Sequence, residues 1–299
     1  MSIVLVYVAV ILAGLVIAPA PAWRRAGGLA IGVLATATPL LVWRFGPAEL
    51  PLVRFIAGLV AGVGLGRLWE LAIDPTPRDA RARVFHATTL FDSRAAVRVP
   101  PELRVRDGLT SSLYYAVAAV GFVVAYVVAP AAPPALRWPV RWLGGIVLLY
   151  CAMDGLGAGL HFCYGLAGWR IPPLHNVPIA SRSLGEFWGQ RWNLPISLWL
   201  RRVCFMPLAR RGHAALGLLA AFAMSALLHL YLTLVAVGWQ LGLLVGALFV
   251  LHGFLIWMER VLGVRRWRPA AGRVWFLATM LATAPLIVEP LLRVAWPGR

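Results

Sequence analysis

Long apolar runs are the feature that most limits how this chain can fold. A helix needs about 20 mostly apolar residues to cross the hydrocarbon core of a bilayer. Eight runs approach or exceed this length, namely residues 2–18, 27–45, 50–73, 109–129, 138–165, 213–237, 239–262 and 273–292. Hydrophobic residues make up 61% of the 299 residues, well above the roughly 45–50% of soluble domains. We therefore predict an all-α, polytopic transmembrane helix bundle of about eight spans, built as a single membrane domain over residues 1–299.

Arginine supplies all of the basic side-chain charge, and it gathers in alternate loops. The chain has a net charge of +17 and contains no lysine. Most loop arginines fall in residues 19–26, 74–108, 166–212 and 263–272, whereas the intervening loops carry almost none. Loops rich in Lys and Arg stay on the cytoplasmic side. We therefore expect these four loops to face the cytoplasm of a bacterial inner membrane, with both termini outside.

The basic loops also indicate what the chain can bind. A basic membrane face attracts anionic lipid headgroups and anionic substrates. Nucleic acid is not an expected partner, because the arginines lie in short loops between spans. We interpret the loop 74–108, which mixes acids, arginines and prolines, as a connector with short helical pieces, solvated or lying on headgroups. The alternative is that it helps to bind an anionic substrate. No basic segment precedes the run 2–18, so we expect a retained helix there rather than a cleaved signal peptide.

The three cysteines do not predict a metal site. Cys151, Cys163 and Cys204 lack the close spacing of metal-binding pairs. We expect buried free thiols rather than a disulfide framework or a zinc site.

Two ionisable residues fall within the apolar run 138–165. Asp154 and His161 are seven residues apart, about two helical turns, so both project from one face of a helix. Gly155 and Gly159 lie beside them and favour close packing against another helix. One interpretation is that the polar pair is bonded to such a neighbour. The other is that it lines a cavity and contacts a substrate.

The polar, aromatic segment 181–195 separates two apolar regions. Ser183 and Glu186 have the spacing of a helix-capping box, and Leu184, Phe187, Trp188 and Arg191 then recur at helical spacing. This pattern predicts an amphipathic helix along the cytoplasmic interface, ended or bent by Pro195 just after Asn193. Helices broken at membrane depth are tolerated where they are buried in protein or line a cavity. Asn193 is therefore a candidate polar group of such a cavity.

A second polar feature lies in the run 213–237. Ser225, His229 and Thr233 are spaced by four residues and form one stripe on an otherwise apolar helix. Ionisable residues inside a membrane usually face the bundle interior or a water-filled cavity. His229 is thus either a hydrogen-bonded core residue or a catalytic group. We do not expect Ser225 to be a serine nucleophile, because no nearby acid would orient the histidine and no nucleophile-elbow pattern is present.

These two features together resemble a known family. The blocks are Ser-Leu-Gly-Glu-Phe-Trp-Gly-Gln-Arg-Trp-Asn at 183–193 and Ser-Ala-Leu-Leu-His at 225–229. They are similar to the Ser-Leu-x-x-Phe-Trp-Gly-x-Arg-Trp-Asn and Ser-Gly-x-x-His blocks of the wax-synthase branch of the membrane-bound O-acyltransferase superfamily. The second block departs at Ala226, where many relatives have glycine. The strong resemblance covers about residues 176–231.

The resemblance implies an acyltransferase built around a central tunnel, with interfacial or re-entrant helices beside it. A fatty acyl group would pass from acyl-CoA, a co-substrate, to a lipid or another hydrophobic alcohol to form an ester. His229 would be the catalytic general base and Asn193 its polar partner. No metal, no cofactor and no covalent enzyme intermediate would be needed.

Further residues are candidates for substrate contacts. Trp188 and Trp192 would line the tunnel or anchor the chain at the interface. Four arginines would bind the phosphates of CoA or would simply mark the cytoplasmic side: Arg182, Arg191, Arg201 and Arg202. Ser225, Asp154 and His161 complete the set of expected substrate-binding residues.

Two other functions use the same polar residues. A transporter would pass protons or a substrate along Asp154, His161 and His229, and a non-catalytic relative would only bind lipid. A transporter of this kind is typically built from two related halves that each contain a broken helix. The sequence has one interrupted segment and no visible internal symmetry, which favours the acyltransferase.

Overall fold

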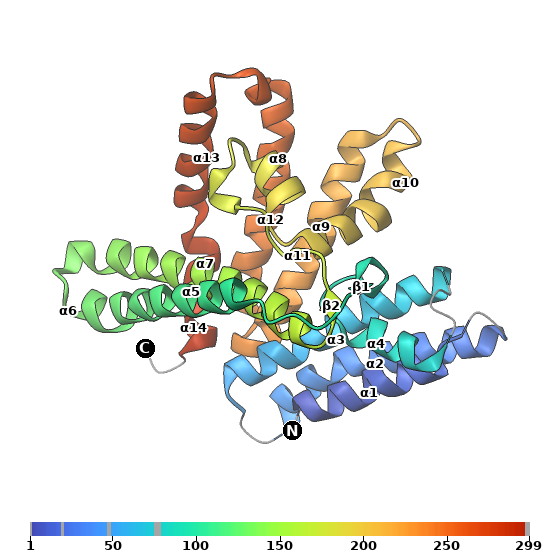
Figure 1. The fold of residues 1–299 in the computed structure, drawn as a ribbon. Helices are drawn as coiled ribbons and strands as arrows, with labels where there is room; N and C mark the ends of the chain where they lie inside the picture. The colour runs from blue at the N-terminus through green and yellow to red at the C-terminus, as the bar shows by residue number, and fades with distance from the viewer. Residues whose placement is uncertain (1, 19–20, 47–48, 75–78, 297–299) are drawn as a thin grey trace. The chain divides into compact units, whose positions relative to one another are not determined.

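The computed structural model describes residues 2–18, 21–46, 49–74 and 79–296, and it is built almost entirely of helices (Figure 1). The α-helices before the interrupted segment are α1 Ser2–Val16, α2 Ala22–Phe45, α3 Pro51–Ile73, α4 Ala80–Thr88, α5 Val105–Val123, α6 Ala129–Ala131 and α7 Pro134–Leu166. Those within and after it are α8 Leu184–Glu186, α9 Leu194–Leu200, α10 Met206–Ala209, α11 Ala214–Val237, α12 Trp239–Val261, α13 Pro269–Thr283 and α14 Pro285–Ala295.

Shorter elements connect these helices. Wide π-turns continue α5 as η2 Val124–Val128, α8 as η4 Phe187–Arg191 and α9 as η5 Arg201–Phe205. Single 3₁₀ turns occur at η1 Ser93–Ala95, η3 Pro178–Ala180 and η6 Val264–Arg266. Two short strands, β1 Val97–Arg98 and β2 Trp169–Arg170, pair in the antiparallel sense with Val97 opposite Arg170.

The predicted all-α, polytopic fold is confirmed, although fewer described helices than the expected eight are long enough to span a membrane. Within the described residues, six helices are long and apolar enough to cross a membrane: α2, α3, the continuous stretch α5–α6, α7, α11 and α12. The first run forms α1, which at 15 residues is shorter than a span. The last run is divided into α13 and α14, bent by 51°, and these would be a seventh span if taken together. The bend falls at Pro285, which lacks the backbone N–H that would continue α13.

The described residues form two compact units. One contains residues 2–96, 228–242 and 293–296, and the other contains residues 97–227 and 243–292. In the first unit, helices α1 to α3 enclose an apolar core of small and branched side chains. Its fully buried members include Val6, Val10, Ala13, Ala57 and Leu68. Because the side chains are small, neighbouring helices approach closely and fill the space between them.

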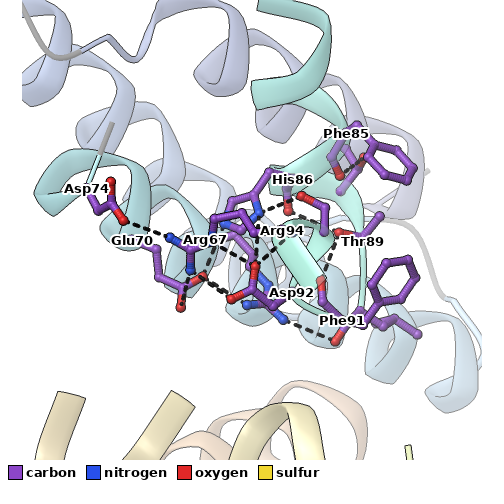
Figure 2. Close-up of polar contacts among 12 residues, drawn as sticks. Arg67, Glu70, Asp74, Phe85, His86, Thr89, Phe91, Asp92 and Arg94 are labelled. Carbon is purple, nitrogen blue, oxygen red and sulfur yellow. Dashed lines mark hydrogen bonds and ion pairs between the residues drawn. The ribbon is translucent and has the colours of Figure 1, made fainter. Parts of the chain in front are cut away.

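A buried polar network ties α4 to α3 in this first unit (Figure 2). Glu70 Oε2 on α3 accepts hydrogen bonds from Arg67 Nη1 at 2.9 Å and from His86 Nε2 on α4 at 3.1 Å. His86 Nδ1 bonds to Ser93 Oγ at 2.8 Å. Arg94 approaches Glu70 at 3.5 Å. The expectation of a solvated connector over 74–108 is therefore wrong for this part, because α4 and the turn after it pack into the unit.

Glycines set the packing of the second unit, where α5 and α7 lie side by side (Figure 1). A Cβ added at Gly121 would lie 2.5 Å from Leu148 N, and one at Gly144 would lie 2.7 Å from Ala125 N. Neither position has room for a methyl group. Further along the same seam, Ser111 Oγ donates to the carbonyl of Gly155 at 2.8 Å. The glycines beside Asp154 therefore serve close helix packing.

Candidate functional site

The 183–193 block folds as a short helical turn followed by a wide one. Ser183 Oγ accepts a hydrogen bond from Glu186 N at 3.0 Å, as expected for the capping residue of α8. The Glu186 carboxylate accepts from Arg182 N at 2.8 Å and from Arg191 Nε at 2.7 Å. Partial burial alone would raise the pKa of Glu186, but these bonds hold it below the usual value. Arg191, an expected substrate contact, thus closes the turn that Glu186 begins.

The chain breaks earlier than predicted. Helical structure ends at Arg191, and Asn193 adopts a left-handed backbone conformation with φ of 43°, which asparagine tolerates better than most residues. Pro195 lies in the first turn of α9, where a missing N–H costs nothing. The prediction that Pro195 ends the first helix is therefore wrong, because it starts the next one.

The segment before the block lies against this break. Asn176 N donates to the carbonyl of Arg191, and Leu194 N donates to the carbonyl of Leu174, each at 2.8 Å. These bonds place His175 beside Trp192, with 4.5 Å between the ring centroids. His175 was not predicted as a site residue, because nothing in the surrounding sequence distinguishes it.

Asp154 pairs with His175 instead of acting with His161. Its Oδ1 lies 3.2 Å from His175 Nδ1, and the two side chains are 11% and 5% exposed. Tyr114 and Tyr150 also lie close enough to the Asp154 carboxylate to interact with it electrostatically. The charged neighbours of His161 are Asp107 and Arg104. Asp154 and His161 therefore interact with different residues, although both project from α7.

The two predicted tunnel tryptophans have different surroundings. Trp192 stacks on Phe187, with 5.4 Å between centroids and an interplanar angle of 14°, and lies next to His175. Trp188 packs against Phe249 at 5.2 Å, and its Nε1 donates to His252 Nδ1 at 3.0 Å. Both tryptophans thus belong to the packed aromatic core around the block.

Two buried polar residues on α12 hold the block in place, and the sequence analysis missed both. Glu259 Oε1 accepts from Leu184 N at 2.7 Å and from Trp275 Nε1 at 2.8 Å, while its Oε2 accepts from Gly185 N at 2.9 Å. His252 receives the Trp188 bond on one nitrogen and bonds to Thr283 Oγ1 at 2.8 Å through the other. Their partners lie far away in the sequence, so local spacing contains no signal for them.

Arginines line two hollows in the same unit. One, of about 250 Å³, is bordered by Leu198, Arg201, Arg202, Met206, Pro207 and Arg210. Another, of about 200 Å³, is lined partly by Arg182, Glu186, Arg265 and Arg268. Among the described residues, no group of three or more His, Cys, Asp or Glu side chains could hold a metal ion. That no cofactor is used stays a prediction.

The residues of the second block lie on α11. Ser225 and Thr233 are buried and His229 is half-buried. His229 belongs to the unit that contains residues 228–242, and Asn193 to the other. That these two side chains meet at one reaction centre stays a prediction.

Known proteins resemble the part of the chain that carries these blocks. Residues 171–251 match the family model described as the membrane bound O-acyl transferase family. "Probable long-chain-alcohol O-fatty-acyltransferase 2" of Arabidopsis thaliana is 32% identical over 120 residues, 36% of this chain and 34% of the relative. "Long-chain-alcohol O-fatty-acyltransferase" of Simmondsia chinensis is 33% identical over 134 residues, 39% of this chain and 37% of the relative.

A third relative extends the match. "Probable long-chain-alcohol O-fatty-acyltransferase 9" of Arabidopsis thaliana is 30% identical over 163 residues, 48% of this chain and 47% of the relative. The chain thus spans between a third and a half of the length of these curated relatives. The predicted resemblance to the wax-synthase-like branch of the membrane-bound O-acyltransferases is confirmed by these matches.

Proposed function

We propose that this chain is a membrane O-acyltransferase that transfers a fatty acyl group to an alcohol and so forms an ester. The observation that carries the proposal is the 183–193 block, which lies within the family match at 171–251. The relatives are named as enzymes that acylate long-chain alcohols. The apolar helices support the same function, because a fatty acyl chain and a long-chain alcohol both partition into lipid.

The acyl donor in this proposal is acyl-CoA, which reaches the protein from the cytoplasm. Its phosphates would bind arginines, whose guanidinium groups match phosphate geometry. The hollow that contains Arg201, Arg202 and Arg210 supports such a contact, and so does the second hollow at Arg182. Arg191 is the least suited of the predicted arginines, because its side chain already binds Glu186 at 2.7 Å.

The proposed chemistry uses one imidazole and one carboxamide. His229 accepts the proton of the alcohol hydroxyl while the alcohol oxygen attacks the thioester carbonyl carbon. The carbon–sulfur bond then breaks, and the CoA thiolate takes the proton back from His229. General-base catalysis of this kind typically contributes about 10²–10⁴-fold. Asn193 donates a hydrogen bond to the carbonyl oxygen as negative charge develops there, a role typically worth about 3–4 kcal/mol.

The local structure around Asn193 supports its role. Asn193 lies between η4 and α9 in a left-handed backbone conformation, so it belongs to neither helical element. A non-glycine residue held in this conformation is found more often at functional sites than elsewhere. The bonds of Asn176 and Leu194 on either side fix this turn.

The test is an acyl-CoA consumption assay on the full chain in lipid nanodiscs, with a long-chain alcohol as acceptor. We expect His229→Ala to lower kcat by about 10²–10⁴-fold and Asn193→Ala to lower it by about 10²–10³-fold. His213→Ala, at an exposed histidine, is the matched control and should keep wild-type turnover. Wild-type turnover in His229→Ala would remove the proposed base, and no ester product from the wild-type protein would remove the function.

A further inference from the structure

His175 is a buried imidazole with one nitrogen left open. Its side chain is 5% exposed, and Nδ1 lies 3.2 Å from Asp154 Oδ1. Nε2 is buried and has no hydrogen-bond partner among the described residues. Buried polar atoms almost always have such a partner, and an unpaired one costs free energy. A ligand atom at Nε2 would supply it.

The pairing with Asp154 sets which nitrogen carries the hydrogen. A neutral imidazole whose Nδ1 donates to a carboxylate keeps a lone pair on Nε2. The polar side chains of Tyr114 and Tyr150 lie near the same carboxylate. The open nitrogen therefore requires a hydrogen-bond donor from the ligand.

The surroundings of the ring favour an uncharged donor. Trp192 lies 4.5 Å from His175, and Tyr150 stacks on the same indole at 6.3 Å. The arginine-lined hollows are bordered by other residues, so the phosphates of a substrate have sites elsewhere. The group that reaches Nε2 is thus an N–H or O–H within an aromatic environment.

The two proposed substrates differ in which hydrogen-bond donors remain available throughout the reaction. The hydroxyl hydrogen of the alcohol is removed during transfer and must go to the base. Acyl-CoA carries two secondary amides in its pantetheine arm, and neither takes part in the reaction. An ethylene unit alone separates the nearer amide nitrogen from the thioester sulfur. Such an amide needs a buried partner once the thioester is inside the protein.

We propose that His175 Nε2 accepts a hydrogen bond from a pantetheine amide N–H of the donor thioester, with Asp154 orienting the ring. This inference rests on the proposed function, since it assumes acyl-CoA as donor. The backbone bonds Asn176 to Arg191 and Leu194 to Leu174 hold His175 against the turn that presents Asn193. An amide bound at His175 therefore holds the thioester close to the carboxamide proposed to bind its carbonyl oxygen. His175 acts as a donor-binding and specificity residue.

The experiment compares donors with and without an amide. The donors are palmitoyl-CoA, palmitoyl-N-acetylcysteamine, which keeps the nearer amide, and palmitoyl butyl thioester, which has none. His175→Phe keeps an aromatic ring beside Trp192 but removes both nitrogens. We expect this variant to raise KM for palmitoyl-CoA by about 10- to 100-fold, with kcat within about threefold. A donor that is not turned over is measured as an inhibitor of the palmitoyl-CoA reaction.

For the butyl thioester, wild type and His175→Phe should have the same affinity. Palmitoyl-N-acetylcysteamine identifies which amide binds. If His175→Phe raises KM for this donor as much as for palmitoyl-CoA, the nearer amide binds at His175. If KM for this donor is unchanged, the farther amide binds there. Asp154→Asn should raise KM for palmitoyl-CoA in the same selective way, because an asparagine amide donates to Nδ1 and leaves the hydrogen on Nε2. If His175→Phe does not fold, Asp154→Asn still tests whether His175 binds the amide. His213→Phe is the control for the substitution itself.

Three results would overturn the proposal. The first is an equal loss of affinity for amide-bearing and amide-free donors, which would mean that His175 only supports the packing. The second is a raised KM for the alcohol with an unchanged KM for the donors, which would make His175 a hydroxyl-binding residue. The third is no change at all. If the wild-type protein consumed no acyl-CoA, the proposed function would fail instead, and retention of palmitoyl-CoA on immobilised wild type and His175→Phe would still test the binding role.

Discussion

His86 and His175 are both buried imidazoles, but their hydrogen bonds differ. His86 is bonded through both nitrogens, to Glu70 and to Ser93. Within the part of the chain that the structure describes, His175 is paired only through Nδ1, with Asp154. A histidine bonded through both nitrogens is part of the fold, whereas a buried nitrogen without a protein partner is the feature from which we infer ligand binding. At the residue scale, the hydrogen-bond partners distinguish a structural from a functional histidine where burial does not.

Protonation of His86 should destabilise the folded protein. Burial, together with the charges of Arg67 and Arg94, lowers the pKa of His86 from 6.5 to about 4. The unfolded chain therefore binds a proton first as the pH falls. The contribution of His86 to the free energy of unfolding should be constant above about pH 6.5, fall by up to about 3 kcal/mol between about pH 6.5 and pH 4, and level off below that. The measurement is the Tm of wild type and His86→Asn in detergent across this range.

The variant should show a shallower decline of Tm with falling pH, because it has no imidazole to protonate at this site. His213→Asn, at an exposed position, should follow the wild-type curve. Identical slopes in wild type and His86→Asn would show that His86 does not contribute to the acid sensitivity.

At the scale of elements, the 183–193 block depends on its neighbours. Helix α8 has three residues and continues into a five-residue π-turn, and helices this short do not persist alone in water. Glu259 on α12 accepts hydrogen bonds from the first two backbone N–H groups of α8. The block is therefore placed by long-range contacts, although its own residues provide its capping.

Glu259→Gln should loosen this placement. An amide at this position would turn at least one N–H toward the backbone N–H groups of Leu184 and Gly185, leaving buried donors unpaired at a cost of about 1–3 kcal/mol. We expect a lower Tm and a lower kcat, although Glu259 contacts no substrate in the proposed reaction. Glu102→Gln, whose side chain is 63% exposed, is the control and should change neither. A wild-type Tm in Glu259→Gln would contradict the anchoring role.

At the scale of the whole molecule, the prediction from sequence succeeded where the signal is periodic or local. Apolar runs identified the helices, and the spacing of Ser183 and Glu186 identified the start of α8. It failed where distant contacts decide the structure. The partner of Asp154 is His175 rather than His161, because an ion pair between separate elements leaves no spacing pattern. Six or seven described helices, not eight, are long enough to span a membrane, since run length alone does not show that α1 stops at Val16 or that Pro285 divides the last run.

The proposed sidedness of the membrane does not depend on α1 or on the bent pair α13–α14. The pairs α2–α3, α5–α7 and α11–α12 each lead from one arginine-rich loop back to another. In a chain without its native cysteines, Arg266→Cys should react with a membrane-impermeant maleimide from the cytoplasmic side only. Arg137→Cys, in the first turn of α7, should react from the other side only. Labelling of both positions from one side would contradict this topology.

The glycine seam between α5 and α7 limits how lipid tails can move. At Gly121 and Gly144 the two backbones approach so closely that even one added carbon would collide with main-chain atoms. A hydrocarbon tail is wider than a methyl group, so none can thread between these helices at that level. At the level of Gly121 and Gly144, α5 and α7 therefore form a wall that is closed to an entering acyl chain or fatty alcohol.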